Sequence, residues 1–317
     1  MAILTVGASQ HYSSLSRAVA AAGDGDTIRV QAGTYTNDFT TIAKDLTIEG
    51  VGGMAKFVAT VAPPNGKAIM VTSADVTIRN LEFSGAKVSS ANGAGIRYES
   101  GDLVVENSYF HHNQMGLLSN GDPDGTIVIR NSEFAFNGGG TGYTHGLYVN
   151  HIQSLTVEDS DFHDANNGHH VKSRAANTIL IDNRIVDGSN GISSYNIDLP
   201  NGGNALLQGN VIQQNAKSPN IAIVSFGAEG KLIAGTALEM IDNVVIDDHA
   251  SANVRLLVNR TTVAAKLIDT DVWGLTAAQL ATGPATITGT DFLAARPAID
   301  SSSPWTTAPT PTPTPTP

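Results

Sequence analysis

The sequence contains no cysteine, so disulfide bonds, thiolate metal sites and thiol nucleophiles are excluded. It also has no run of 18 apolar residues, and we therefore expect no membrane span. The first residues, MAILTVGASQHYSSL, lack a basic segment followed by a long apolar one, so they do not form a standard signal peptide. This start is compatible with a cytosolic protein, a removed leader or export through a C-terminal signal.

Charged residues are scarce, at 15% of 317 residues, and the formal net charge is −11. An acidic protein is a poor general ligand for nucleic acid, and we expect no nucleic-acid partner. A polyanionic substrate would bind only where a local basic patch overrides this mean field. What is abundant is glycine, with 32 residues, as suits a β-rich chain with many tight turns.

The strongest positive signal is an internal repeat of a short strand, an Asn or Asp, and an apolar anchor. Four phrases end on a phenylalanine: VTIRNLEF (76–83), LVVENSYF (103–110), IVIRNSEF (127–134) and LTVEDSDF (155–162). The repeat continues as ILIDNRIV (179–186), ALLQGNVI (205–212) and EMIDNVVI (239–246). Within each phrase Val and Ile alternate with polar residues, which is the period of a strand with one buried face.

A second strand follows each anchor after a Gly or Asn: GIRYE (95–99), GLLSN (116–120), GLYVN (146–150), GHHVK (168–172), GISSY (191–195), NIAIV (220–224) and NVRLL (253–257). No helix-length pattern separates the strands. Such short strands bury an apolar face only by stacking coil upon coil, so the sequence predicts a parallel β-helix solenoid of about ten coils over residues 1–300. The recurrent asparagines are predicted to stack as one ladder: Asn80, Asn107, Asn131, Asn183, Asn210 and Asn243.

We expect a short helix near each end of the solenoid. Residues 14–22 are Ala-rich and amphipathic and would cap the first coil, and residues 275–281 would form a second short helix before a last strand at 285–292. Residues 301–317 are a Thr-Pro linker. We expect this linker to lead to a catalytic or binding module absent from the sequence, and we expect the protein to be a monomer.

The opening GDTIRVQAGTY (25–35) and the repeated VxIxN coils resemble the pectate-lyase-like superfamily of right-handed parallel β-helix proteins. The resemblance covers about residues 1–295. It implies a right-handed β-helix that acts outside the cell on an acidic polysaccharide. The superfamily includes polysaccharide lyases, polygalacturonase-type hydrolases, C5-epimerases, phage tailspikes and plain surface proteins, so the site must decide the activity.

A cluster of Tyr, His, Lys and Arg in THGLYVNH (144–151) and GHHVKSR (168–174) is the candidate site. We aligned the second strands on their leading Gly or Asn, which places Tyr148, His170 and Ser193 outward on adjacent coils about 4.8 Å apart. The candidate catalytic residues are Tyr148, His170, Lys172, His145 and Arg174. The candidate substrate-binding residues are Asn150, His151, Tyr195, Arg97 and Ser193.

These residue types suit proton abstraction beside the carboxylate of a uronic acid. Removing the C5 proton builds negative charge that Lys172 or Arg174 would neutralise. His170 or His145 would be the base, and Tyr148 would be the acid or would act as base and acid in turn. Elimination makes the enzyme a lyase, whereas returning the proton to the other face makes it an epimerase.

Three other interpretations stay open. A glycoside hydrolase needs convergent carboxylates, for which Asp161, Asp164, Asp187 and Asp198 are the candidates. A non-catalytic module would bind sugar through the same face without converting it. SNGDPDGT (119–126) superficially resembles a calcium loop, but a turn is the better interpretation, so we expect catalysis without a metal, with Ca²⁺ the alternative. His169 is predicted to be a core histidine.

Overall fold

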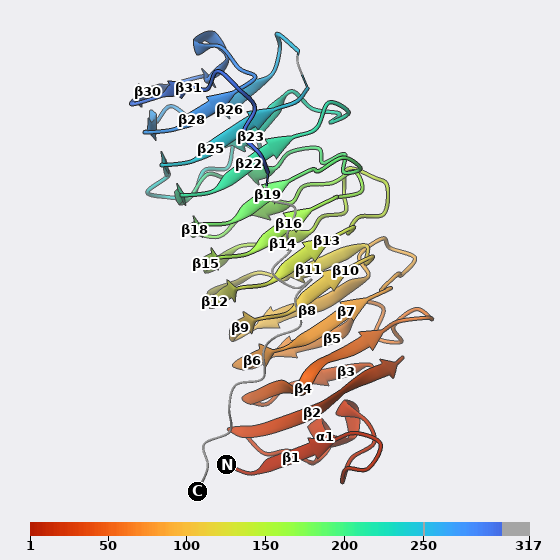
Figure 1. The fold of residues 1–317 in the computed structure, drawn as a ribbon. Coiled ribbons are helices and arrows are strands. Elements are labelled where there is room, and N and C mark those ends of the chain that lie inside the picture. Colours follow the sequence, from red (N-terminus) through yellow and green to blue (C-terminus); the bar gives the residue numbers. More distant parts are fainter. Residues whose placement is uncertain (250, 300–317) are drawn as a thin grey trace, which may run out of the picture.

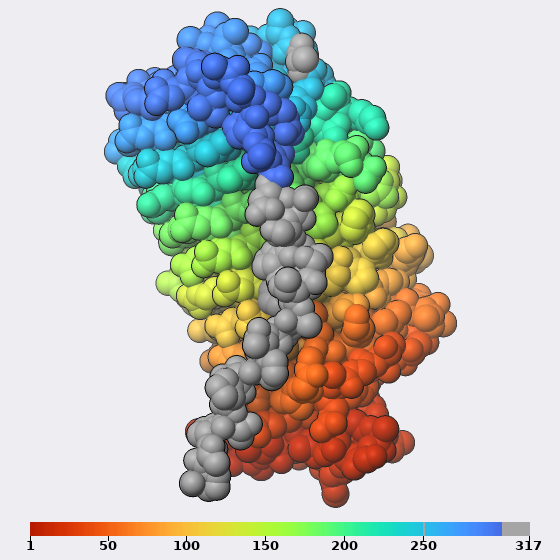
Figure 2. All heavy atoms as spheres, in the orientation of Figure 1, coloured from red at the N-terminus to blue at the C-terminus, as the bar shows by residue number. Residues whose placement is uncertain are grey.

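The computed structural model describes residues 1–249 and 251–299, which wind into one solenoid of short parallel strands (Figure 1). Three strands alternate around each coil because the sequence repeats an apolar–polar alternation broken by turn residues. Each strand pairs in parallel with its equivalent one coil further on, so the strands stack into long ladders. In the space-filling view successive coils appear as stacked bands of colour from one end of the solenoid to the other (Figure 2). The predicted parallel β-helix is confirmed.

The strands form three ladders, which we call sheets 1, 2 and 3. Sheet 1 contains β1 (Ile3–Val6), β2 (Asp26–Thr36), β4 (Leu46–Val58), β6 (Val76–Arg79), β9 (Asp102–Glu106), β12 (Asp122–Arg130), β15 (Ile152–Glu158), β18 (Asn177–Ile181), β21 (Asn204–Gln208), β24 (Ala237–Ile241), β27 (Ala265–Ile268) and β30 (Ala285–Thr288). Sheet 2 contains β7 (Leu81–Ser84), β10 (Tyr109–His111), β13 (Glu133–Ala135), β16 (Asp161–His163), β19 (Arg184–Val186), β22 (Val211–Gln214), β25 (Val244–Asp247), β28 (Asp271–Trp273) and β31 (Asp291–Phe292). Long β4 joins the two, since it pairs with both β6 and β7.

Sheet 3 contains β3 (Thr40–Ile42), β5 (Ala68–Ser73), β8 (Ala94–Ser100), β11 (Met115–Ser119), β14 (Leu147–Val149), β17 (Val171–Ser173), β20 (Ile197–Leu199), β23 (Ala222–Phe226), β26 (Arg255–Asn259) and β29 (Ala281–Thr282). Ten strands in this ladder agree with the expected number of coils. It carries the candidate site on its outer face.

The core is a column of inward side chains that repeats from coil to coil. The anchor phenylalanines of sheet 2 are in register, and Phe83, Phe110, Phe134 and Phe162 stack with ring centroids 5.1, 4.6 and 4.7 Å apart. All four are buried. Their irregular spacing in the sequence is taken up by loops, so the stack itself stays regular across these four coils.

The turn between sheets 1 and 2 corrects the prediction of a single asparagine ladder. Asn80, Asn107 and Asn131 have positive φ angles of 55°, 49° and 45°, a conformation that Asn tolerates better than most residues. Asn183, Asn210 and Asn243 occupy the next position of the turn instead. Their side chains form a buried ladder, in which Nδ2 of one donates to Oδ1 of the next at 3.0 Å.

Both predicted end helices are present. The α-helix α1 (Leu15–Ala21) closes the first coil and buries Leu15, Ala18 and Val19, with Ser14 as its N-cap. Near the other end lies the short 3₁₀ helix η1 (Ala277–Gln279). None of the helices in the described ranges is long and apolar enough to cross a membrane. The Thr-Pro segment 301–317 lies outside the described residues.

Candidate functional site

The outer face of sheet 3 carries a row of side chains set by strand register. Leu118, Tyr148, Lys172, Asp198 and Ser225 follow one another on β11, β14, β17, β20 and β23. In each strand the flanking residues point inward to the core, as Leu147 and Val149 do beside Tyr148. The row therefore brings a phenol, an ammonium and a carboxylate onto adjacent coils.

This register corrects the predicted one. His170 and Ser193 do not lie beside Tyr148 on the outer face, because they are only 1% and 0% exposed. The alignment on leading glycines was wrong because the turns that precede sheet 3 differ in length. Leu147 directly follows Gly146, but its partner Val171 lies three residues after Gly168. Lys172 and Asp198 take the places that had been predicted for His170 and Ser193.

Tyr148 lies between two cations. Its hydroxyl accepts a hydrogen bond from Nη1 of Arg174, whose guanidinium carbon is 5.1 Å from the ring centroid, and the Lys172 ammonium is 5.9 Å from it. Burial raises the pKa of the Tyr148 phenol, and Arg174 opposes that rise. The phenol is thus protonated at neutral pH, yet a donor is in place to stabilise its phenolate form.

Glu229 completes this group from a loop that follows β23. Its carboxylate lies 2.5 Å from Nη2 of Arg174 and 3.7 Å from Nζ of Lys172. Burial alone would raise the pKa of Glu229, but the hydrogen bonds and positive charges of Arg174 and Lys172 together outweigh burial and lower it. The Glu229 side chain is 44% exposed, whereas those of Lys172 and Arg174 are 14% and 12% exposed. Sequence reasoning missed this residue, since nothing in the repeat marks a loop as returning to the site.

Asp198 is the buried carboxylate of the site. Its Oδ2 lies 3.1 Å from Nζ of Lys172 and 3.5 Å from Nε2 of His169. Within the described residues, Oδ1 is buried and has no hydrogen-bond partner. Burial raises the pKa of Asp198, although Lys172 opposes the rise. The sequence offered Asp198 only as a hydrolase candidate. Its alternating Ile-Asp-Leu context was the signal that places it outward.

Three aromatic rings stack beside this row. The rings of His145 and His169 are 4.4 Å apart, His169 and Tyr195 are 4.9 Å apart, and His145 meets Tyr148 edge-on at 5.5 Å. Burial lowers the pKa of His145 to about 3 and that of His169 well below its ordinary value, so both rings are neutral at pH 7. The prediction that His169 is a buried, hydrogen-bonded histidine is confirmed, and its Nε2 in addition faces Asp198 of the site.

Hydrogen bonds fix which nitrogen of each ring carries the proton. Nδ1 of His145 accepts from the His169 amide at 3.0 Å, and Nδ1 of His169 accepts from the Tyr195 amide at 3.3 Å. Each neutral ring therefore carries its proton on Nε2 and presents a donor there. A histidine base, as predicted for His145, does not fit this arrangement.

The other predicted binding residues lie further out. Asn150 and His151 form the turn after β14 and bond to each other, with Nδ1 of His151 2.8 Å from Oδ1 of Asn150. Arg97 is in the same outward row as Tyr148 but two coils away, and it pairs with Glu99 at 3.0 Å. Tyr195, half-buried, is the one that touches the cluster directly.

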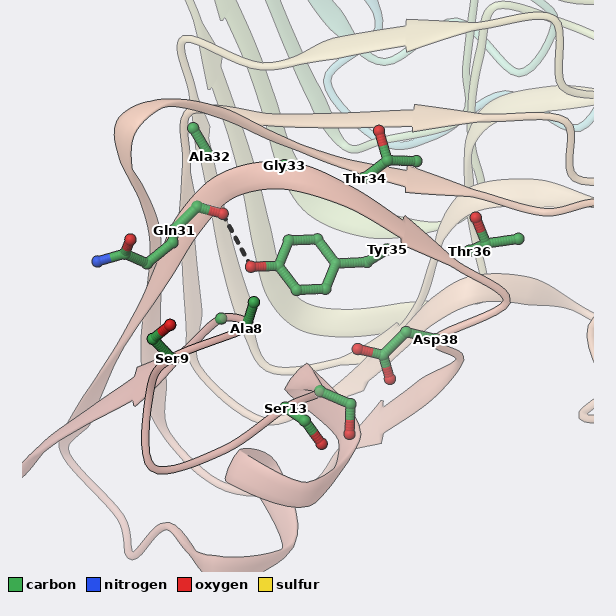
Figure 3. Close-up of a pocket in the computed structure, with 12 residues that line it drawn as sticks. Ala8, Ser9, Ser13, Gln31, Ala32, Gly33, Thr34, Tyr35, Thr36 and Asp38 are labelled. Atoms are coloured by element: carbon green, nitrogen blue, oxygen red, sulfur yellow. Dashed lines mark hydrogen bonds between the residues drawn. The ribbon is translucent and has the colours of Figure 1, made fainter.

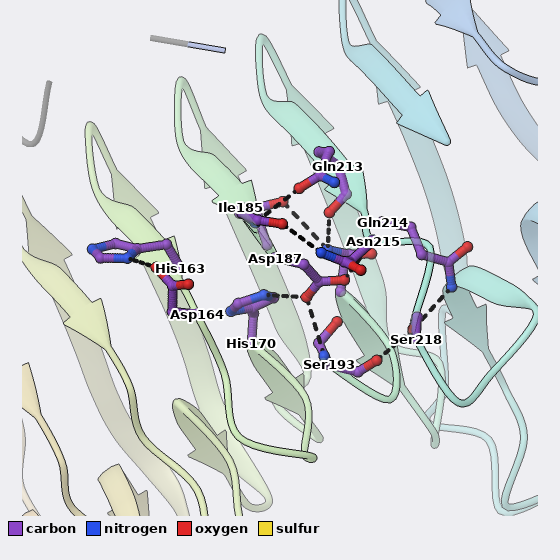
Figure 4. A network of polar contacts seen from close by, with 12 residues as sticks. His163, Asp164, His170, Ile185, Asp187, Ser193, Gln213, Gln214, Asn215 and Ser218 are labelled. Atoms are coloured by element: carbon purple, nitrogen blue, oxygen red, sulfur yellow. Dashed lines mark hydrogen bonds and ion pairs between the residues drawn. The ribbon is translucent and has the colours of Figure 1, made fainter. Parts of the chain in front are cut away.

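His170 belongs to a buried polar network behind the site (Figure 4). Its Nε2 lies 2.9 Å from Oδ1 of Asp187, which also accepts from the Ser193 amide, while Oδ2 of Asp187 accepts from the Asn215 amide. His170, Asp187 and Ser193 are at most 1% exposed. This network ties three loops together, and no substrate can reach it.

Of the remaining carboxylate candidates, Asp161 lies on β16 of sheet 2 and Asp164 directly follows that strand. Asp161 pairs with Arg184 at 2.6 Å, and Asp164 is 2.7 Å from Nδ1 of His163. The turn predicted for residues 119–126 is wrong for Asp122 and Asp124, because both belong to β12, at the start of that strand where its register shifts. No group of three or more His, Cys, Asp or Glu side chains in the described residues is arranged to hold a metal ion.

A separate hollow lies at the N-terminal coil, between the loop after β1 and the end of β2 (Figure 3). Small and hydroxyl side chains line it, and the Tyr35 hydroxyl donates to the Gln31 carbonyl at 2.8 Å. Its carboxylate, Asp38, accepts from the amides of Leu15 and Ser16 and so caps α1. This hollow is far along the solenoid from Tyr148 and has a structural role.

The chain matches no family model and no curated protein. Among solved structures it is similar to pectate lyase Pel9A, with a TM-score of 0.60 and 15% identity over 92% of this chain and 79% of that one. ORF18 of Geobacillus virus E2 follows, with a TM-score of 0.58 and 14% identity over 87% of this chain and 55% of that protein. The A-module of Azotobacter vinelandii mannuronan C-5 epimerase AlgE6 has a TM-score of 0.42 and 15% identity, over 89% of this chain and 94% of that module. The first two similarities show the fold: a pectate-lyase-like right-handed parallel β-helix.

Proposed function

We propose that the protein is an extracellular enzyme that cleaves a uronate-containing polysaccharide by β-elimination on the outer face of sheet 3. The observation that carries the proposal is the setting of Tyr148, a half-buried phenol that accepts from Arg174 and has Lys172 over its ring. A proton donor for the leaving oxygen and two cations for the carboxylate of a uronate are the groups this reaction needs.

The proton transfers can be assigned to the two groups able to make them. Ionised Asp198 takes the C5 proton, and the electrons of the C5–H bond form the C4=C5 double bond as the C4–O bond breaks. Tyr148 donates its proton to the departing oxygen, and Arg174 stabilises the phenolate that remains. Asp198 then returns its proton through solvent, which restores both groups. The Nε2–H groups of His145 and His169 act as neutral donors that orient the site.

Glu229 occupies the position that the substrate carboxylate needs. Because it is the most exposed member of the group and sits on a loop, it can leave while Lys172 and Arg174 stay in place. A uronate carboxylate would then bind the same two cations, without calcium. This exchange explains how a protein of net charge −11 accepts an acidic polymer.

A second candidate, a glycoside hydrolase, is favoured by one observation. Asp198 and Glu229 both contact the Lys172 ammonium, and their pKa values shift in opposite directions. A protonated acid beside an ionised carboxylate is the pair that glycoside hydrolysis uses. Epimerisation would use the same groups as elimination, and a binding module would use the same face without turnover.

The proposal is tested by incubating the protein with alginate, pectate and glucuronan, with and without EDTA, while following the ultraviolet absorbance of the unsaturated uronate. We expect absorbance that grows, persists in EDTA and is lost in Tyr148→Phe. Tyr143→Phe, at an exposed loop tyrosine, is the matched control and should retain activity. New reducing ends without absorbance would establish hydrolysis instead, and C5 proton exchange without cleavage would establish epimerisation.

A further inference from the structure

A second hollow begins one coil beyond Asp198 on the outer face of sheet 3. It is lined by Tyr195, Ala222, Ser225, Arg255, Val258 and Arg260, among others. Ser225 is the register partner of Asp198, so the hollow continues the row that carries the candidate site. Tyr195 stacks on His169 of the site and forms the shared wall.

The two arginines of this hollow, Arg255 and Arg260, have no carboxylate partner among residues 1–249 and 251–299. Every other arginine in the described ranges except Arg17 has a carboxylate oxygen within 4.0 Å. Arg255 is held by its own loop, since its Nη1 donates to the carbonyls of Ala252 and Val254, and Arg260 is exposed. In an acidic protein that pairs all but one of its other described arginines with a carboxylate, two guanidinium groups without such a partner make this hollow locally cationic.

The position of the hollow sets how it relates to the reaction. Arg255 lies in the row of His169 and Tyr195, two coils after Tyr195, and Val258 lies three coils after Lys172. At about 4.8 Å per coil, the hollow is roughly 10–14 Å along the solenoid axis from the proposed point of cleavage. Its floor of Ala222 and Val258 offers an apolar surface to a sugar ring, and the arginines flank that floor.

We propose that this hollow is a second binding site for an acidic sugar of the same polymer, several residues from the bond that is broken. The inference rests on the proposed function for the polymer's identity as a uronate chain. It adds a requirement on the substrate. The preferred polymer carries a carboxylate on a sugar away from the cleaved bond as well as on the sugar that reacts. Arg255 and Arg260 bind that distant carboxylate, so that long acidic chains bind more tightly than short ones.

The test measures binding by calorimetry in the Tyr148→Phe protein, so that turnover does not enter. The probes are hexamers and trimers of galacturonate, of guluronate and of glucuronate. We expect at least one acidic hexamer to bind roughly tenfold more tightly than its trimer, and Arg255→Gln or Arg260→Gln to remove that difference while leaving trimer affinity unchanged. Arg17→Gln, which alters the third arginine that lacks a carboxylate partner in the described part of the chain, is the matched control and should change nothing.

The outcomes separate this inference from the proposed function. Hexamer and trimer affinities that stay equal, an Arg260→Gln protein that binds as the parent does, or no binding of any acidic hexamer would each overturn the inference. If the hexamer binds through the arginines and the wild-type protein cleaves no polymer, the hollow is established and the β-elimination is not. Because Arg260 is exposed, its substitution tests the hollow even if Arg255→Gln disturbs its loop.

Discussion

The carboxylate of Glu229 lies 2.5 Å from Nη2 of Arg174, although 55 residues separate them in the sequence. One residue of a loop after β23 thereby neutralises a cation on the coil that carries β17. The contact makes this loop part of the candidate site. The role of Glu229 differs between β-elimination and glycoside hydrolysis, so its substitution distinguishes the two reactions.

Glu229→Gln is predicted to lower KM for an acidic polymer and to leave kcat nearly unchanged if the enzyme is a lyase. The substitution removes the negative charge that competes with the substrate carboxylate for Lys172 and Arg174. Steady-state kinetics on the cleaved polymer measures both constants. Glu239→Gln, which alters a similarly exposed carboxylate paired with Lys266, is the control. A fall of kcat by a factor of about 10² or more would instead assign Glu229 to a hydrolytic carboxylate pair.

Asp198 is predicted to set the acid limb of the pH–rate profile. As the base it must be ionised, and burial raises its pKa above the ordinary value of 3.8, so kcat/KM should fall as pH drops through that raised pKa. Asp198→Asn should lower kcat by roughly 10²–10⁴-fold with the fold retained. Activity that persists in Asp198→Asn would show that another group takes the proton.

His163 is predicted to make stability fall at alkaline pH. Burial lowers its pKa, but hydrogen bonds to Asp164 at 2.7 Å and Glu133 at 2.9 Å outweigh burial and raise it to about 9. Protonated His163 contributes its full share to the free energy of unfolding below the unfolded-state pKa of about 6.5. This contribution is lost at about 1.4 kcal/mol per pH unit as pH rises toward the folded-state value.

Urea unfolding measured between pH 6 and pH 10 tests this linkage. His163→Gln should flatten the decline, and His11→Gln, on the exposed N-terminal loop, should keep it. If the free energy of unfolding of the His163 variant falls with pH as it does in the parent, another titrating group is responsible for the fall.

The asparagine ladder is predicted to stabilise the solenoid strongly. Asn210 accepts from Asn183 and donates to Asn243 and to the Leu180 carbonyl, all in the interior. Asn210→Ala leaves these buried partners unsatisfied and should lower the free energy of unfolding by about 2–4 kcal/mol. Asn204→Ala, at an exposed strand start, should cost under about 0.5 kcal/mol in the same denaturation series. If the two substitutions lower the free energy of unfolding equally, the buried ladder contributes no more stability than an exposed amide.

The sequence by itself determined the solenoid. Val and Ile at alternate positions and an apolar anchor in each coil leave one way to bury the apolar face. The strands of sheets 1 and 2, the Phe83-to-Phe162 stack and helix α1 therefore follow from local pattern. The same pattern brought Tyr148, Lys172 and Arg174 together as candidates, because they lie in two consecutive coils.

Only the tertiary structure decided which of their neighbours face the site. The turns before β14, β17 and β20 differ in length, so His170 belongs to the buried turn before β17 and not to the strand face on which the sequence placed it. Asp198 faces the site because register pairs it with Lys172, and Glu229 reaches the site from a loop whose path no repeat encodes. Alternation of apolar and polar residues specifies a strand. Which side chains meet on neighbouring coils depends on the path of each loop, and that path is fixed only in the stacked solenoid.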